Sequence, residues 1–193
     1  MDISTTNYPH NLPENLWMFV QHPTDTTALK YYLARGGSID AVDGNPCDGE
    51  VWYTTLLMYT LCHDSPTANF FLLLEKGGGS LVDVQDSWGS TALHVCARFG
   101  NAGSMEILLK DYYANPNIQN KSGETPLHEA AHYNKVECLK LLMWHGGDIS
   151  LKNINGKTAL DILRDENINE DIILQIESYA SEVESMNVKE PAV

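Results

Sequence analysis

Apolar residues along this chain recur at helical spacing in short paired runs, and each pair is followed by a polar break. The pattern is clearest between residues 86 and 152, where a run opened by threonine precedes a run rich in leucine. Apolar residues at helical spacing predict amphipathic helices, and clusters of Gly, Asn and Asp predict turns. The chain is therefore predicted to consist of helix pairs joined by polar turns.

One phrase opens the first helix of three successive pairs. Thr91, Thr125 and Thr158 each begin a Thr-x-Leu segment, and they lie 34 and 33 positions apart. The segments read Thr-Ala-Leu-His-Val-Cys-Ala, Thr-Pro-Leu-His-Glu-Ala-Ala and Thr-Ala-Leu-Asp-Ile-Leu-Arg. Internal repeats of this length are typical of stacked helix pairs that bury a shared core.

The repeated phrase and its setting resemble the ankyrin repeat, in which a turn is followed by Thr-Pro-Leu-His-x-Ala-Ala, a polar break and a Leu-Leu helix. Residues 120–152 carry this pattern most fully, with Gly123 before Thr125 and Gly146-Gly147 after the second helix. The resemblance implies an all-α ankyrin-repeat solenoid of about five helix-turn-helix repeats with β-turn tips. Its terminal repeats are expected to be degraded, because end repeats must present a polar outer face.

We therefore predict one ankyrin repeat domain over residues 12–184. Its expected units are residues 12–42, 43–85, 86–119, 120–152 and 153–184. A flexible N-terminal segment (1–11) and a disordered tail (185–193) are expected at the ends of the chain. A chain of 193 residues with 43% hydrophobic content is long and apolar enough for one short solenoid with a continuous core.

Two segments depart from the repeat pattern. In unit 86–119, Tyr112 and Tyr113 stand where the family has Gly-Ala, and the unit is one residue longer. The glycine that adopts positive φ at low cost is missing there, so we expect an atypical turn. Before Thr55, residues 41–54 form an insertion with two Asp-Gly pairs and one Asn-Pro pair. Insertions in solenoids map to loops, often on the binding face.

The repeated histidines are expected to be structural. In the family, the Thr and His of the phrase hydrogen-bond locally and tie each turn to its helix and to the next repeat. Threonine also fits a helix N-cap on general grounds. Asp161 stands in the place of a third histidine, which argues against a repeated catalytic or metal-binding role. The residues assigned to this structural motif are Gly89, Thr91, His94, Gly123, Thr125, His128, Gly156 and Thr158.

The net charge of −14 lies mainly at the two ends of the chain. Residues 161–193 hold nine acidic residues against Arg164 and Lys189, and residues 1–50 hold seven against Lys30 and Arg35. Such a surface repels nucleic-acid phosphates, so nucleic-acid binding is not expected. The acids either attract a basic protein partner or simply solvate the two ends of the solenoid.

The sequence lacks the usual signatures of an enzyme or a cofactor site. It has no phosphate-binding loop, no Gly-x-Ser-x-Gly and no His-Glu-x-x-His. A zinc site built from Cys47, Cys62 and His63 has no usual ligand spacing. We therefore predict a non-enzymatic protein with no cofactor and no metal.

Several features favour a location inside the cell. The N-terminus lacks the basic and apolar regions of a signal peptide, and no apolar run approaches the ~18 residues of a membrane span. The four cysteines have no Cys-x-x-Cys pairing and are read as free thiols of a reducing compartment. We expect a cytoplasmic or nuclear protein without a membrane partner, acting as a monomer or as a subunit of a hetero-complex.

Candidate recognition residues are those that the scaffold does not use. In ankyrin proteins, partners are held by the turn tips and by first-helix residues after the Ala-Ala pair. The corresponding turn tips are Ser87, Trp88, Ser90, Lys121, Ser122, Glu124, Ile154, Asn155 and Lys157. The corresponding groove positions are Cys62, His63, Arg98, Phe99, His132 and Tyr133, and the end of the insertion adds Trp52 and Tyr53.

The aromatic residues of this set carry the sharpest hypothesis. Exposed aromatic side chains are common anchors of interfaces, and Phe99 and Tyr133 recur at one repeat position, which predicts a shared binding strip. For Trp88 two interpretations stay open: it binds a partner, or it packs on Tyr53 or Val51 of the preceding repeat. Trp52 and Tyr53 either bind a partner or cover the edge of their own repeat.

Two functions remain as alternatives. The first is a protein-protein interaction module or adaptor that uses its groove and turn tips. The second is an acidic escort for a basic client, such as a ribosomal or other nucleic-acid-binding protein. Affinity led by charge should fall steeply with salt, whereas affinity led by aromatic anchors should not.

Overall fold

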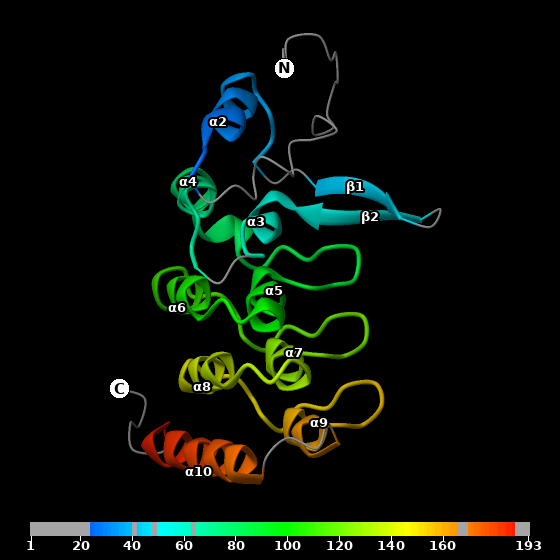
Figure 1. Cartoon of the computed structure of the whole chain (residues 1–193), viewed down its shortest axis with the longest axis vertical. Helices are drawn as coiled ribbons and strands as arrows, with labels where there is room; N and C mark the ends of the chain where they lie inside the picture. The colour runs from blue at the N-terminus through cyan, green and yellow to red at the C-terminus, as the bar shows by residue number, and fades with distance from the viewer. Residues whose placement is uncertain (1–23, 40–41, 48–49, 63–64, 166–169, 188–193) are drawn as a thin grey trace.

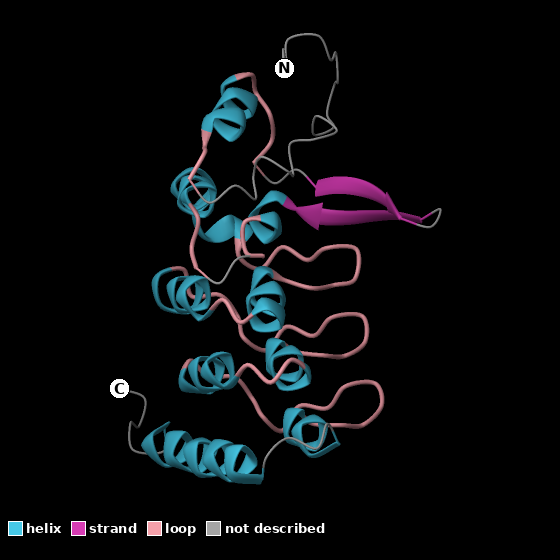
Figure 2. Ribbon diagram, in the orientation of Figure 1, coloured by secondary structure: helices cyan, strands magenta, loops and turns pink. Residues whose placement is uncertain are grey.

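The computed structural model describes residues 24–39, 42–47, 50–62, 65–165 and 170–187. Within them, short helix pairs stack on one another, with one helix of each pair in an inner column and the other in an outer column (Figure 1). Loops project from the inner column, away from the outer helices (Figure 2). The predicted N-terminal segment 1–11 and the first part of the predicted unit 12–42, up to residue 23, lie outside the described residues.

The helices occur in the order that the repeat pattern predicts. The inner column contains α3 (Leu56–Tyr59), α5 (Ala92–Phe99), α7 (Pro126–His132) and α9 (Ala159–Asp165). The outer column contains α2 (Thr27–Ala34), α4 (Ala68–Gly77), α6 (Ala102–Asp111), α8 (Val136–Trp144) and α10 (Glu170–Asn187), with a short 3-10 helix, η2 (Gly78–Leu81), after α4. Helix α7 packs against α5, α8 and α9, and α8 packs against α6 and α10. The predicted solenoid of helix pairs is confirmed.

Two segments differ from the prediction, one in its conformation and the other in where it ends. The insertion before α3 is not a loop but an antiparallel hairpin of β1 (Val42–Cys47) and β2 (Glu50–Thr55), paired from Val42 opposite Thr55 to Cys47 opposite Glu50. It projects on the same side as the loops of the later repeats (Figure 1). Helix α10 continues to Asn187, so the predicted start of a disordered tail at residue 185 is wrong. The final residues, 188–193, lie outside the described part of the chain.

The core is a continuous apolar layer between the two columns. Leu93 and Leu127 of the inner helices are fully buried, as are Leu108 and Leu139 of the outer ones. Ala97 and the Ala130-Ala131 pair are also fully buried, and their small side chains allow neighbouring inner helices to approach closely. Because each helix pair covers the apolar face of the next, no single repeat can form this core alone.

A threonine and a histidine fix the start of two inner helices. The backbone N–H of Thr91 donates to Nδ1 of His94 (3.0 Å), and the N–H of Thr125 donates to Nδ1 of His128 (3.1 Å). In return, each threonine side chain accepts a bond from the histidine backbone, which completes a capping box. These are local bonds of the kind that the ankyrin resemblance implies for the threonine and histidine of the repeated phrase.

The second nitrogen of each histidine reaches the next repeat. Because Nδ1 accepts a bond from a backbone N–H, the neutral ring carries its proton on Nε2. This group donates to the carbonyl of Glu124 from His94 (2.9 Å) and to the carbonyl of Lys157 from His128 (3.1 Å). One neutral imidazole therefore both starts a helix and positions the following turn.

Asp161 performs only the first of these two tasks. Its Oδ2 accepts bonds from the backbone N–H (3.0 Å) and the hydroxyl of Thr158 (2.8 Å). The N–H of Thr158 is the main cause that lowers the pKa of this carboxyl. A carboxylate in this place has no donor for a further repeat, and the described part of the stack ends with this helix pair.

The loops before Thr91, Thr125 and Thr158 are hairpin-like turns, which we call fingers (residues 85–91, 119–125 and 152–158). They stack through backbone bonds, from the N–H of Lys121 to the carbonyl of Trp88 (2.8 Å) and from the N–H of Ile154 to the carbonyl of Ser122 (3.1 Å). The finger glycines, Gly89, Gly123 and Gly156, all have positive φ, as their assignment to the structural motif requires.

The turn after α6 is atypical, as predicted. Tyr113 adopts a positive φ of 54° at the position that glycine occupies after α8, where Gly146 has a φ of 86°. After α8 the turn closes by a bond from Gly147 to Leu142, five residues back, whereas Ala114 bonds Leu108, six residues back. The extra residue thus widens the turn, and a bulky side chain is held in a conformation that it rarely adopts.

Two matched glycine substitutions test the stacking of the fingers. Both require positive φ, but a Cβ on Gly123 would lie 2.9 Å from the backbone nitrogen of Ile154, whereas a Cβ on Gly156 would meet nothing within 4 Å. We expect Gly156→Ala to lower the free energy of unfolding by about 1 kcal/mol, and Gly123→Ala to lower it by at least about twice as much. Urea denaturation of both variants measures the difference, and equal losses would contradict finger-to-finger packing.

Candidate functional site

Large aromatic side chains are exposed on the finger side of the stack. Phe99 at the end of α5 and Tyr133 just after α7 are 41% and 50% exposed, at the same position of successive repeats. Trp88 at a finger tip is 45% exposed. We call these three residues the aromatic strip. Their exposure leaves all three rings accessible to a partner, and the alternative packing of Trp88 on Tyr53 or Val51 involves side chains outside the described residues.

The other predicted recognition residues fall into four groups. Lys121, Ser122, His132, Ile154, Asn155 and Lys157 are exposed, and so is Arg98, although its guanidinium is engaged. Ser87, Cys62 and Glu124 are half-buried. Ser90 is only 4% exposed, so its assignment to the partner-binding surface is wrong. His63 and the side chains of Trp52 and Tyr53, whose backbone belongs to β2, lie outside the described residues.

Ser90 is buried because the finger turns back at this point. Its N–H donates to Oδ1 of Asp86 (2.8 Å), and its carbonyl accepts from the Asp86 N–H (2.9 Å). Both partners lie inside the same finger, so the residue closes the turn instead of forming its tip. Asn120 and Asn153 hold the next two fingers in the same way.

Asp86, Asn120 and Asn153 are structural residues that the sequence reading missed. Each side-chain oxygen accepts two backbone N–H groups of its own finger. They stand five positions before Thr91, Thr125 and Thr158, so the repeat alignment contained the signal. Asp86 is the only charged one of the three, and burial raises the pKa of its carboxyl.

A buried ion pair lies beside the aromatic strip. Arg98 donates from Nη2 to Oε1 of Glu129 (2.8 Å) and from Nε to Oε2 (3.2 Å), a bidentate pair between successive repeats. The Glu129 side chain is only 5% exposed, whereas the Arg98 side chain is 44% exposed. Sequence reading treated Arg98 as available for a partner and missed Glu129, whose carboxylate occupies a position filled by Val95 one repeat earlier.

In the next two repeats, His132 and Asp165 align with Arg98, and each pairs inside its own repeat. His132 donates to Oε1 of Glu124 (3.1 Å), and Oδ2 of Asp165 contacts Nζ of Lys157 (2.6 Å). In both pairs, one partner immediately precedes the motif threonine and the other follows it by seven positions. Ser90 precedes the threonine of the Arg98 repeat, so this arginine finds its carboxylate in the next repeat instead.

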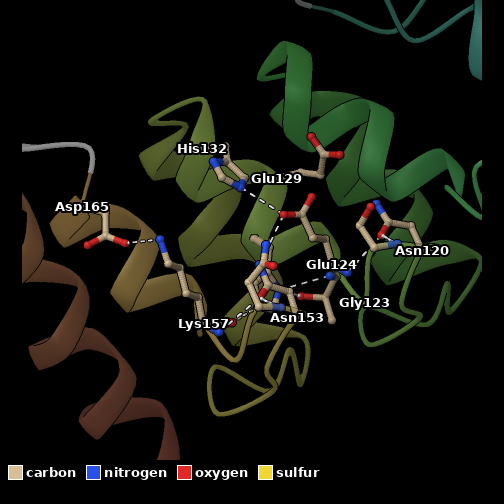
Figure 3. Close-up of polar contacts among 12 residues, drawn as sticks. Asn120, Gly123, Glu124, Glu129, His132, Asn153, Lys157 and Asp165 are labelled. Atoms are coloured by element: carbon tan, nitrogen blue, oxygen red, sulfur yellow. Dashed lines mark hydrogen bonds and ion pairs between the residues drawn. The ribbon is translucent and has the colours of Figure 1, made fainter.

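These pairs line a small cavity between the last two fingers. Figure 3 shows the side chains of His132 and Asn153 converging on Glu124, with Lys157 reaching toward Asp165 on the other side. The cavity has a volume of about 100 Å³, and buried Ile162 contributes an apolar part of its wall. Glu124 and Asp165 supply two carboxylates to it, against one ammonium group from Lys157.

Two of the described cysteines have buried thiols of low reactivity. Cys96 and Cys138 are buried in successive repeats, and burial raises the pKa of both thiols, that of Cys138 to about 11. Thiols with such pKa values are poor nucleophiles and poor metal ligands at neutral pH. Within the described residues, no cluster of three or more His, Cys, Asp or Glu is placed to hold a metal ion.

Comparison with known proteins identifies the repeat. The family model described as ankyrin repeats (many copies) matches residues 73–128 and 111–163, which include the two complete Thr-His capping boxes. The chain is an ankyrin-repeat protein. The predicted resemblance is thereby confirmed, and the stack of helix pairs and fingers is an ankyrin solenoid.

Ankyrin proteins from several organisms are similar to the chain. The human SH3 and multiple ankyrin repeat domains protein 2 is 37% identical over 135 residues, which cover 70% of this chain. The mouse protein phosphatase 1 regulatory subunit 12A is 38% identical over 91 residues, or 47% of the chain, and an ankyrin repeat-containing protein of Schizosaccharomyces pombe is 35% identical over 75 residues, or 38%. The matched segments span 7%, 9% and 36% of these relatives, so the likeness concerns the repeats.

The ankyrin scaffold determines which side chains remain exposed on this surface. Ankyrin repeats act as protein-protein interaction modules, and several of the side chains that the scaffold leaves exposed here are aromatic or belong to paired charges. No helix among the described residues is long and apolar enough to cross a membrane.

Removal of the Arg98 guanidinium should destabilise the ankyrin stack. The substitution Arg98→Met keeps the aliphatic stem but leaves the Glu129 carboxylate buried without its cation, which should cost about 2 kcal/mol of unfolding free energy. The double variant Arg98→Met/Glu129→Leu removes both charges and should recover most of that loss. Urea denaturation measures both values, and a single variant as stable as the wild type would show that the pair contributes little.

The neutral histidines should make the stack sensitive to acid. Burial lowers the pKa of His94 and His128 below the ordinary value of 6.5, so the unfolded chain binds protons that the folded chain does not. Their contribution to stability is therefore complete above about pH 6.5 and is lost as the pH falls toward their folded pKa values. Denaturation midpoints between about pH 7.5 and pH 5 should decrease in this window.

The variants His128→Asn and His132→Gln separate the two classes of histidine in this experiment. Loss of the buried imidazole in His128→Asn should make the decrease with acid shallower, although the variant is less stable at every pH. His132→Gln removes an exposed imidazole and leaves both capping boxes intact, so it is the control variant. A slope that vanished in His132→Gln would assign the acid sensitivity to the surface pair instead.

Proposed function

We propose that this chain is a non-enzymatic adaptor that binds a protein partner through its aromatic strip and the tips of its fingers. The observation that carries the proposal is the exposure of Trp88, Phe99 and Tyr133 on the finger side of successive repeats. Large rigid aromatic side chains supply much contact area at a low entropic cost, which makes them frequent anchors of interfaces. The names of the relatives support the same class of function, because one is a regulatory subunit of a phosphatase.

The distribution of charge favours aromatic anchoring over a purely acidic escort. The charged side chains beside the strip are compensated, since Arg98 meets Glu129, His132 meets Glu124, and Lys157 meets Asp165. The outer helix α10, by contrast, carries five acidic residues and no lysine or arginine. A partner on the finger side would therefore meet apolar rings among paired charges, whereas the larger acidic surplus lies on the opposite column.

The proposal also includes the cellular location of the adaptor and the boundaries of its repeat domain. We place the adaptor in the cytoplasm or nucleus, because buried free thiols persist in reducing compartments. We assign residues from about 12 to 187 to one repeat domain that acts alone or within a hetero-complex.

Capture of partners with matched variants tests the proposal. The double variant Phe99→Ala/Tyr133→Ala removes two of the three rings of the strip without touching the capping boxes and should lose at least about tenfold in partner affinity. Trp144→Ala is the control, because Trp144 is 55% exposed but lies on outer helix α8. Partners are identified by affinity capture from the source cell and mass spectrometry, and their affinities are measured by titration. The proposal is wrong if the double variant keeps every partner.

Salt separates the two modes of binding. Affinity through the strip should change less than about threefold between about 0.05 and 0.5 M salt, because buried aromatic contacts are not screened. A charge-led escort should lose affinity steeply over the same range. A steep loss that the strip variant does not alter would favour the escort.

A further inference from the structure

We propose that the cavity between the last two fingers binds an arginine side chain of the partner, an inference that rests on the adaptor function proposed above. The cavity is lined by the carboxylates of Glu124 and Asp165, the imidazole of His132 and the ammonium group of Lys157. It adjoins the aromatic strip in sequence, because His132 immediately precedes Tyr133. A chain held on the strip therefore passes close to its opening.

The size of the cavity selects a side-chain head group. Its volume of about 100 Å³ is smaller than the roughly 150 Å³ of an enclosed cavity known to admit a benzene ring. Because the cavity is also open to solvent, an aromatic ring or a nucleotide base would be only partly enclosed. A planar guanidinium fits, with the aliphatic part of its side chain against the apolar wall that Ile162 provides.

The charge of the cavity selects a cation. Two carboxylates, those of Glu124 and Asp165, line it together with one ammonium group, that of Lys157. The Glu124 side chain is only 18% exposed, and charges act more strongly where water is partly excluded. Oε1 of Glu124 already accepts bonds from His132 (3.1 Å) and Asn153 (3.4 Å). Because a carboxylate has two acceptor oxygens, Glu124 can accept a further donor without losing these bonds.

The arrangement favours arginine over lysine. The two carboxylates lie on opposite walls of the cavity, one on the finger before α7 and the other at the end of α9 (Figure 3). A guanidinium presents donors on several edges and can bond both walls, whereas an ammonium group acts as a point charge. The Lys157 side chain is half exposed, so its flexible stem can move its ammonium group aside toward water while the guanidinium contacts Asp165.

Titration with a minimal ligand tests this inference without the natural partner. The probe is N-acetyl-arginine amide, followed by shifts of backbone amide signals in the full chain. The control probe is N-acetyl-citrulline amide, which has the same shape but no charge. We expect saturable shifts at Glu124, Asn155 and Asp165 with the arginine probe, and binding at least about tenfold weaker with citrulline. Equal binding of the two probes, or no saturation, overturns the inference.

Two variants locate the binding. Glu124→Gln keeps an oxygen acceptor for His132 and leaves the backbone carbonyl that holds His94, so the fold should persist; it should weaken the arginine probe about fivefold or more. Asp165→Asn, on the opposite wall, should act in the same direction. Glu137→Gln is the control, because the Glu137 side chain is 77% exposed on outer helix α8. An equal loss in this control would mean that only the general acidity of the protein attracts the probe.

The two proposals fail independently. If the arginine probe does not bind but partner capture still requires Phe99 and Tyr133, the adaptor function stands and the arginine cavity is wrong. If the probe binds and the strip variant keeps every partner, the cavity exists but does not serve the proposed adaptor surface.

Discussion

The ankyrin stack depends on two hydrogen bonds that each neutral imidazole of the repeat motif makes, one through each ring nitrogen. Through Nδ1, His94 and His128 fix the N-terminus of an inner helix, and through Nε2 they hold the backbone of the next finger. Because one ring sets both positions, each finger is placed relative to the helix before it. Protonation would put a hydrogen on the nitrogen that must accept, so the buried ring has to stay neutral.

This constraint explains why the repeated residues are not the functional ones. The capping boxes, the finger glycines and the Asp86, Asn120 and Asn153 oxygens are all occupied by backbone groups. Side chains that differ between repeats are not used by the scaffold and can carry recognition. They include both aromatic rings and paired charged groups. The pairing keeps charge from accumulating on the finger side, while α10 carries an acidic surplus on the opposite column.

The departures from the repeat pattern follow from position in the stack. Asp161 can replace histidine where no described finger follows, because a carboxylate still caps the helix. Gly156 has open space where Gly123 has the next finger against it. Tyr113 has a different origin: an extra residue widens the turn, and its side chain, 85% exposed, is held in a strained backbone conformation. Such strain persists only because the helices on either side determine the turn.

The sequence by itself determined the repeat, its spacing, the capping role of the threonines and histidines, the atypical turn at Tyr113 and the aromatic strip. These features are local or recur at a fixed period, so the residue pattern reports them directly. The tertiary structure alone decided that Ser90 is buried, that Glu129 neutralises Arg98, and that Glu124 and Asp165 share a cavity. The burial of Ser90 depends on how its finger turns back on itself. The other two depend on which side chains of neighbouring repeats meet across the stack, and on which of several nearby partners a charged group reaches. The hairpin before α3 also required the structure, because its turn-forming residues fit a loop and a strand pair equally well.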